Sequence, residues 1–161
     1  MRIGLRQGFI FIPDINTMRA QEILPNIWLG DIASATSVSF CRKRQIRLCC
    51  NCCNSSTTHH SNISTFHLPQ DLTAEGLLET TRRLAISYKT LTPTLIYCET
   101  GNQASATLVA AFLIRYTGME WESAIRILQT KRPEAFRPTI WGLDYIKQME
   151  EACCRENVEE L

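Results

Sequence analysis

A cysteine stands at the end of a short apolar run, directly before a glycine-containing loop and a second apolar stretch. The run covers residues 95–98 and ends on Cys98, Gly101 lies in the loop, and a helical pattern begins at Ala104. Backbone N–H groups in such a loop converge with the positive end of the helix dipole, so the junction can bind a phosphate-sized anion. A cysteine there can have a pKa well below its reference value of about 8.5. The junction therefore favours a thiolate at Cys98, and a small buried apolar side chain is the alternative that the strand pattern alone leaves open.

Strand and helix patterns alternate along the rest of the chain. Extended segments are predicted at residues 23–30, 45–53, 65–69 and 95–98, and helices at 31–44, 73–89, 104–116, 120–131 and from 139 to about 154. Asp31 and Thr73 are candidate N-caps, and Gly118 is a stop signal. The alternation predicts one α/β domain with a short central sheet flanked by helices. We place this domain at residues 22–155, between a lead-in at 1–21 and a tail at 156–161.

The loop also carries a recognisable motif. Residues 97–105 (YCETGNQAS) resemble the signature His-Cys-x-x-Gly-x-x-Arg-Ser of the dual-specificity phosphatases, which are small members of the protein tyrosine phosphatase superfamily. The resemblance extends to residues 23–30, to the strand around Asn51, to residues 105–109, and to the closing segments 131–133 and 141–143. It covers residues 22–149, so we expect the fold of that family.

The resemblance implies a two-step hydrolysis of phosphorylated proteins that needs no metal and no cofactor. Cys98 matches the nucleophile, Asp71 is the candidate general acid, and Ser105 matches the hydroxyl that helps the thiolate leave. Asp71 also precedes a helix, so a capping role is the alternative. The residues expected to hold the phosphate are Glu99, Thr100, Gly101, Asn102, Gln103 and Ala104.

The sequence departs from the signature at the arginine, whose position is taken by Ala104. That arginine normally binds two phosphate oxygens, and arginine donors in phosphoryl transfer contribute on the order of 10³–10⁵ in rate. Tyr97 replaces the signature histidine, and Thr139 replaces an asparagine of the closing motif, a change expected to affect loop bracing. We therefore expect a pseudophosphatase, inactive or severely weakened, that binds phosphorylated or unmodified protein partners. A working cysteine-dependent phosphatase for phosphotyrosine, phosphoserine and phosphothreonine is the alternative.

Eight cysteines are the unusual feature of the composition. Four of them fall within residues 49–53, on a predicted strand where neighbouring side chains point to opposite faces, so we expect free thiols. A zinc site that includes His59 and His60 is disfavoured because the cysteines lack the paired spacing of such sites. A regulatory disulfide between Cys53 and Cys98 remains an alternative.

The 161 residues carry 17 Lys and Arg against 16 Asp and Glu, a formal net charge of +1. This balance excludes the strongly basic surface of a dedicated nucleic-acid-binding protein. No apolar run approaches the length of a membrane span. The expected free thiols indicate a reducing compartment, so we expect a cytoplasmic protein, with the nucleus as an alternative additional location. The basic residues Arg42, Lys43, Arg44 and Arg47 are interpreted as a solvated face, with docking of an acidic partner as the alternative.

Overall fold

A mostly parallel sheet positions the predicted loop. The structure is a computed structural model that describes residues 20–54, 57, 59 and 62–159. Its five strands are ordered β2-β3-β6-β4-β5. They are β2 (Ala20–Leu24), β3 (Ile27–Asp31), β4 (Leu48–Asn51), β5 (Ser64–His67) and β6 (Thr94–Cys98). Only the pairing of β2 with β3 is antiparallel, so the carboxyl ends of the other four strands meet at one edge of the sheet.

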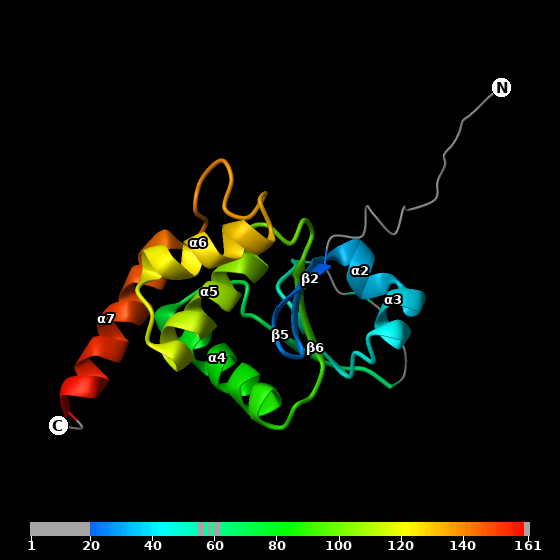
Figure 1. The fold of residues 1–161 in the computed structure, drawn as a ribbon, viewed down its shortest axis with the longest axis horizontal. Coiled ribbons are helices and arrows are strands. Elements are labelled where there is room, and N and C mark those ends of the chain that lie inside the picture. Colours follow the sequence, from blue (N-terminus) through cyan, green and yellow to red (C-terminus); the bar gives the residue numbers. More distant parts are fainter. Residues whose placement is uncertain (1–19, 55–56, 58, 60–61, 160–161) are drawn as a thin grey trace.

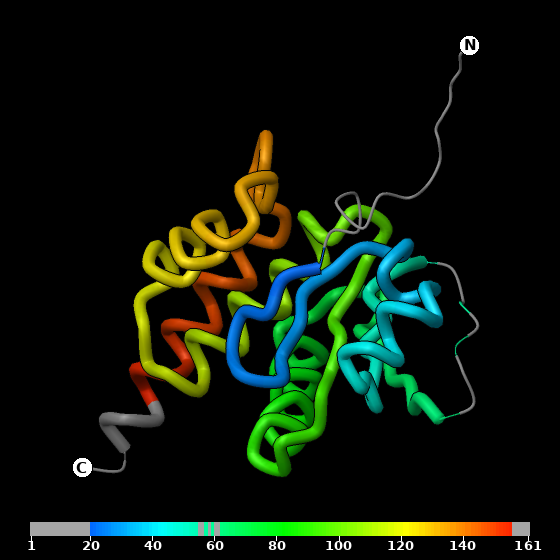
Figure 2. Tube along the Cα trace, turned by 45° about the vertical axis from the view of Figure 1, so that its right-hand side comes forward, coloured from blue at the N-terminus to red at the C-terminus, as the bar shows by residue number. Residues whose placement is uncertain are grey.

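Helices cover both faces of this sheet (Figure 1). They are α2 (Ile32–Thr36), α3 (Val38–Lys43), α4 (Ala74–Lys89), α5 (Ala104–Thr117), α6 (Trp121–Lys131) and α7 (Leu143–Glu159). The short helices α2 and α3 lie on one face, and the four longer helices lie on the other. Figure 2 shows the β2–β3 hairpin beside β6, with α2 and α3 across the sheet from α5. The predicted α/β architecture is therefore correct.

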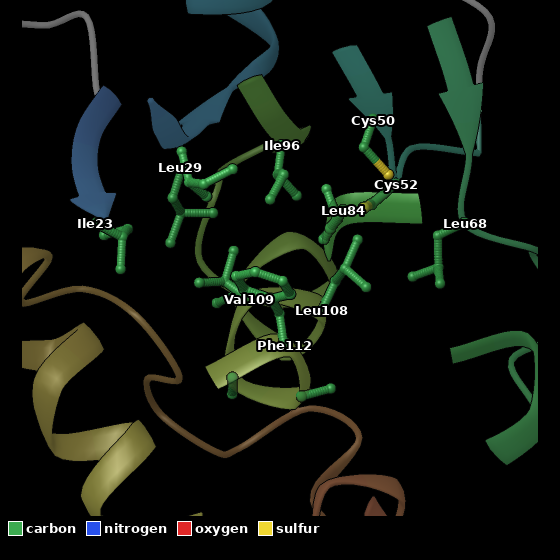
Figure 3. Packing of buried hydrophobic residues seen from close by; sticks show 14 of the residues in the cluster. Ile23, Leu29, Cys50, Cys52, Leu68, Leu84, Ile96, Leu108, Val109 and Phe112 are labelled. Carbon is green, nitrogen blue, oxygen red and sulfur yellow. The ribbon is translucent and has the colours of Figure 1, made fainter. Parts of the chain in front are cut away.

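The core lies between the sheet and α5. Leu29 of β3 and Ile96 of β6 point toward Leu108, Val109 and Phe112 of α5, and all five side chains are buried (Figure 3). Helix α5 is apolar all round because it is enclosed by the sheet and by α4, α6 and α7. Among the described residues, no helix is long and apolar enough to cross a membrane.

Two of the predicted caps form as expected. The Asp31 carboxylate accepts a hydrogen bond from the Ser34 N–H at 2.9 Å, and the Thr73 hydroxyl accepts one from the Gly76 N–H at 2.9 Å. These bonds satisfy N–H groups that have no partner within their helices, and they fix where α2 and α4 begin. Gly118 ends α5, as the sequence predicts.

Several predicted boundaries are wrong. The helix expected at 31–44 is split because the Ser37 hydroxyl caps a new helix through the Phe40 N–H. The last helix begins at Leu143, after a turn, and continues to Glu159, into the segment 156–161 that was expected to be a tail. Strand β2 begins at Ala20, so the lead-in expected at 1–21 ends earlier; its remaining residues lie outside the described part of the chain.

We predict that the Leu108→Ala variant loses about 2–5 kcal/mol of unfolding free energy, because the truncation leaves a cavity between the sheet and α5. Urea denaturation followed by circular dichroism measures the loss. Ile127→Ala is the control, since Ile127 is partly exposed on α6 and should cost less than about 1 kcal/mol. Equal losses in the two variants would contradict this placement of the core.

Candidate active site

The structure brings Cys98, Gly101 and Ser105 together at the carboxyl edge of the sheet. Cys98 is the last residue of β6, and its side chain is 3% exposed. Its Sγ lies 3.1 Å from the Ser105 Oγ of α5 and accepts a hydrogen bond from the Gly101 N–H at 3.2 Å. The predicted nucleophile and the predicted hydroxyl are therefore in direct contact.

The surroundings of Cys98 favour its thiolate. Burial by itself raises the pKa of this thiol, but hydrogen bonds from the Ser105 hydroxyl and from the backbone N–H groups of Ser105, Gln103 and Gly101 outweigh burial and lower the pKa of Cys98. Gln103 is the N-cap of α5, and its side chain forms no cap bond, so the first N–H groups of the helix remain directed at the loop. Such a loop can stabilise an anion at or beside the sulfur.

The loop has a backbone shape that only glycine fits at its centre. Gly101 has a φ of +76°, and a Cβ added there would lie 2.5 Å from the Arg132 Nη2 and 2.6 Å from the Gly30 carbonyl oxygen. The loop is therefore held closely between the end of β3 and the segment after α6. This contact, together with the positive φ, turns the Gly101 N–H toward the Cys98 sulfur.

Arg132 braces the loop from behind, a role that the sequence did not reveal. Its side chain is fully buried. The Nε donates to the Asn102 Oδ1 at 3.0 Å, the Nη2 to the Thr100 carbonyl at 2.7 Å, and the Nη1 to the Gln21 Oε1 at 2.5 Å. This guanidinium therefore joins β2, the loop and the end of α6. Arg132 is not among the residues that line the pocket at Cys98, so it does not replace an arginine at position 104.

A pocket of about 340 Å³ opens above Cys98. Its lining residues are Cys52, Cys53, Asn54, Leu68, Pro69, Gln70, Cys98, Glu99, Thr100, Gln103, Ala104 and Trp141. Ala104, the first residue of α5, contributes no cation, and no lysine or arginine is among these lining residues. Glu99 is the charged side chain of the set. The pocket therefore offers backbone N–H groups and a helix dipole to an anion, but no positive side chain.

The other predicted phosphate-binding residues use their side chains to hold neighbouring segments. Glu99 accepts a long hydrogen bond of 3.5 Å from the Asn54 N–H, and the Thr100 hydroxyl accepts from the Asn102 N–H at 3.1 Å. Gln103 donates to the Arg137 carbonyl at 2.9 Å and accepts from the Trp141 N–H at 3.2 Å. Gln103 thus holds the closing segment, residues 137–141, against the loop, and Trp141 of this segment lines the pocket. Thr139, which replaces an asparagine in the same segment, is exposed.

Asp71 lies beside the pocket without lining it. It is exposed in the loop between β5 and α4, next to Gln70, which does line the pocket. Gln70 donates to the Asn54 carbonyl at 3.0 Å and so joins this loop to the one after β4. Asp71 does not cap α4, because Thr73 does. Its role as the general acid stays a prediction.

Tyr97, which stands in the place of the signature histidine, belongs to a buried polar cluster. Its hydroxyl contacts the Thr57 hydroxyl and lies 2.9 Å from the His59 Nε2. The His59 Nδ1 lies 3.1 Å from the Ala35 carbonyl, which can only accept, so Nδ1 is the donor in this hydrogen bond. Burial raises the pKa of Tyr97, so the hydroxyl remains neutral. The cluster ties the loop after β4 to β6 and α2, and no sequence pattern indicated it.

None of the eight cysteines is in a disulfide in the structure. Cys49 and Cys50 are buried on β4, and Cys50 and Cys52 lie close together in the core (Figure 3). Burial raises the pKa of Cys53 to about 12, and the negative charge of Glu99 adds to the effect. No group of metal-ligating side chains is found among the described residues, although His60 lies outside them. Cys53 and Cys98 line the same pocket, and a disulfide between them stays an untested alternative.

We predict that Ser105→Ala raises the pKa of Cys98, because it removes a hydrogen bond that favours the thiolate. The thiolate should then form at a higher pH. A titration of thiolate absorbance, with the Cys98→Ser signal subtracted, measures the midpoint. Ser87→Ala is the matched control, since Ser87 is a buried helical serine that bonds to the Leu84 carbonyl. Identical midpoints for Ser105→Ala and the unchanged protein would contradict the assignment.

We predict that Arg132→Met lowers the unfolding free energy by roughly 3–5 kcal/mol, because it leaves buried acceptors of the loop without their donor. Urea denaturation measures the change. Arg126→Met, on the exposed side of α6, is the control and should stay within about 0.5 kcal/mol of the unchanged protein. A small effect of Arg132→Met would show that the loop keeps its shape without the brace.

Comparisons with known proteins agree with this geometry. Residues 27–152 match the model of the dual specificity phosphatase catalytic domain. A search of curated protein sequences gives no match.

Solved structures provide the second comparison. A variant of human DUSP28 is 18% identical with a TM-score of 0.78, covering 86% of this chain and 98% of that one. A mouse putative dual specificity phosphatase complexed with zinc tungstate is 18% identical with a TM-score of 0.77, covering 86% and 91%. The human tyrosine phosphatase-like serine/threonine/tyrosine-interacting protein is 19% identical with a TM-score of 0.72, covering 86% and 98%. With the family model matching most of its length, the chain belongs to the dual-specificity phosphatase family.

Proposed function

We propose that this protein is a pseudophosphatase, which uses the pocket above Cys98 to bind a side chain of a phosphorylated or unmodified partner protein and hydrolyses phosphate esters slowly or not at all. The observation that carries the proposal is that no lysine or arginine is among the described residues that line the pocket. Ala104 stands where the family has an arginine, and the guanidinium of Arg132 donates to the Asn102 side chain and the Thr100 carbonyl and does not line the pocket.

The missing cation affects both binding and rate. A charge-assisted hydrogen bond contributes about 1.5–3 kcal/mol, and the absent arginine would supply two of them to a phosphate. The carboxylate of Glu99 and a thiolate at Cys98 add negative charge to the same pocket, which opposes a phosphate dianion. Charge that develops on the phosphoryl oxygens in the transition state meets only backbone N–H groups and the helix dipole.

The shape of the pocket suits a protein side chain. Leu68, Pro69 and Trp141 provide apolar walls, and Gln70 and Asn54 provide uncharged polar groups at the rim. Such a lining can hold an aromatic or aliphatic side chain without requiring a charge on it. This supports a partner that is recognised through the pocket whether or not it is phosphorylated.

A working phosphatase is the second candidate, and one observation favours it. Cys98 contacts the Ser105 hydroxyl and the Gly101 N–H, and its pKa is lowered, so a nucleophilic thiolate is available. In that case the thiolate attacks phosphorus, Asp71 protonates the leaving oxygen, and water then cleaves the cysteinyl phosphate. The loop amides alone would have to stabilise the transition state.

Turnover of an aryl phosphate by the unchanged protein and by Ala104→Arg tests the proposal. We expect negligible turnover by the unchanged protein and a gain of roughly 10³-fold in Ala104→Arg, because the new guanidinium supplies the missing transition-state charge. Ala104→Met is the matched control, since it adds a long side chain without a charge, and Cys98→Ser should abolish any gain.

Two outcomes would overturn parts of this account. If the unchanged protein hydrolyses the aryl phosphate as fast as Ala104→Arg, and Cys98→Ser abolishes that activity, the protein is a phosphatase and the pseudophosphatase proposal is wrong. If Ala104→Arg stays as inert as Ala104→Met, the missing charge is not the sole defect and the assignment of Asp71 as general acid loses its support.

A further inference from the structure

A second concave surface lies at the opposite end of the sheet from Cys98. This basal groove is lined by Arg47, Ser64, Phe66, Arg83, Ile86 and Thr92, at the amino ends of β4, β5 and β6 and along α4, and it has a volume of about 530 Å³. A neighbouring depression of about 420 Å³ shares Arg47 and Thr92 with it. The two depressions adjoin at these shared residues, and neither shares a residue with the pocket above Cys98.

The basal groove is positively charged, and its two arginines, Arg47 and Arg83, are exposed to solvent. In the described part of the chain, no aspartate or glutamate lines either depression. Residues 32–70 contain four basic side chains and no acidic one. Within the described residues, the recorded ion pairs join Arg82 to Glu79 and Arg155 to Glu151, so neither Arg47 nor Arg83 is in one.

Arg83 is held in place even though it is exposed. Its guanidinium lies 4.5 Å from the centre of the Phe66 ring, which is buried beneath it. A planar guanidinium that stacks on a ring keeps its N–H groups free at the edge, where they can bind a carboxylate in a bidentate manner. The stacking therefore reduces the entropy that Arg83 loses when it binds an anion.

Large apolar side chains accompany these cations. Ile86 is 64% exposed on α4, and Leu91 is 68% exposed in the loop that follows α4 and borders the neighbouring depression. A purely electrostatic surface for a nucleic acid does not need exposed aliphatic side chains. A membrane surface, in turn, favours apolar groups that protrude rather than border a concavity. The combination fits a peptide that carries both carboxylates and aliphatic side chains.

We propose that the basal groove is a docking site for an acidic segment of a partner protein. Carboxylates of the segment bind the guanidinium groups of Arg47 and Arg83, and an aliphatic side chain of the segment packs against Ile86. The site is independent of the proposed pseudophosphatase function, because it lies at the other end of the strands and shares no residue with the pocket above Cys98.

Fluorescence anisotropy with a labelled synthetic peptide of alternating glutamate and leucine tests the proposal on the full chain. We expect saturable binding that Arg83→Gln and Arg47→Gln each weaken by about tenfold. Arg82→Gln is the matched control, since Arg82 is the exposed neighbour of Arg83 on α4 but pairs with Glu79, and it should leave the affinity unchanged. Cys98→Ser should also leave it unchanged, and added salt should weaken binding by the unchanged protein.

Other outcomes would overturn the proposal. A peptide of alternating glutamine and leucine that binds equally well would show that carboxylates are not recognised. Equal affinities for Arg82→Gln and Arg83→Gln, in variants whose circular dichroism shows a native fold, would place the peptide elsewhere. Tighter, Arg47-dependent binding of vesicles rich in phosphatidylserine, or of single-stranded RNA, would assign the groove to a different class of partner.

Discussion

The loop after β6 depends on tight packing at the position where a Cβ of residue 101 would lie. The Gly30 carbonyl at the end of β3 and the guanidinium of Arg132 leave no room for a Cβ at this position. Arg132 in turn is fixed by bonds to β2 and to the loop itself. Arg132 therefore links the sheet, the loop and the end of α6. These links hold the loop in the shape that directs its backbone N–H groups at Cys98.

This dependence explains how the site can keep its form without the signature arginine. The contacts that hold the loop backbone in place come from Arg132, Gly30 and Gln103. None of them involves the side chain of residue 104. With an alanine at the start of α5 the pocket lacks that charge, while the hydrogen bonds from Ser105 and Gly101 to the Cys98 sulfur are present. The shape of the loop backbone therefore does not depend on the charge of the side chain at position 104. A fold that matches the family does not by itself establish the family's chemistry.

The order of the elements was predictable from the sequence because local signals determined it. Apolar periodicity marked α4, α5 and α6, and the side chains of Asp31 and Thr73 capped helices where expected. The helix predicted at 31–44 failed because Ser37 formed a competing cap in its middle. The closing helix begins late, at Leu143, after a segment whose Trp141 carbonyl accepts the Thr107 hydroxyl at 2.5 Å, a contact between distant segments that no local pattern encodes.

In the candidate active site, too, the residues placed by local sequence patterns were predictable and those placed by distant contacts were not. Cys98, Gly101 and Ser105 lie within eight positions of one another, so the strand, loop and helix pattern could place them together. Arg132 reaches Thr100 and Asn102 across about thirty residues, and His59 reaches Tyr97 from a polar loop without a recognisable pattern. Contacts between residues so distant in the sequence depend on how the helices and strands pack together. Apolar periodicity and helix caps predict the elements but not their packing.

The length of β6 separates the arginines of the basal groove from the pocket above Cys98. The strand spans five residues, so its two ends lie roughly 13 Å apart at about 3.3 Å per residue. At physiological ionic strength the Debye length is about 8 Å, so exposed charges at one end of the sheet are largely screened from the other. The guanidinium groups of the basal groove therefore do not offset the missing cation beside Cys98. Ionic strength should thus weaken binding in the groove much more than it changes the potential at the sulfur.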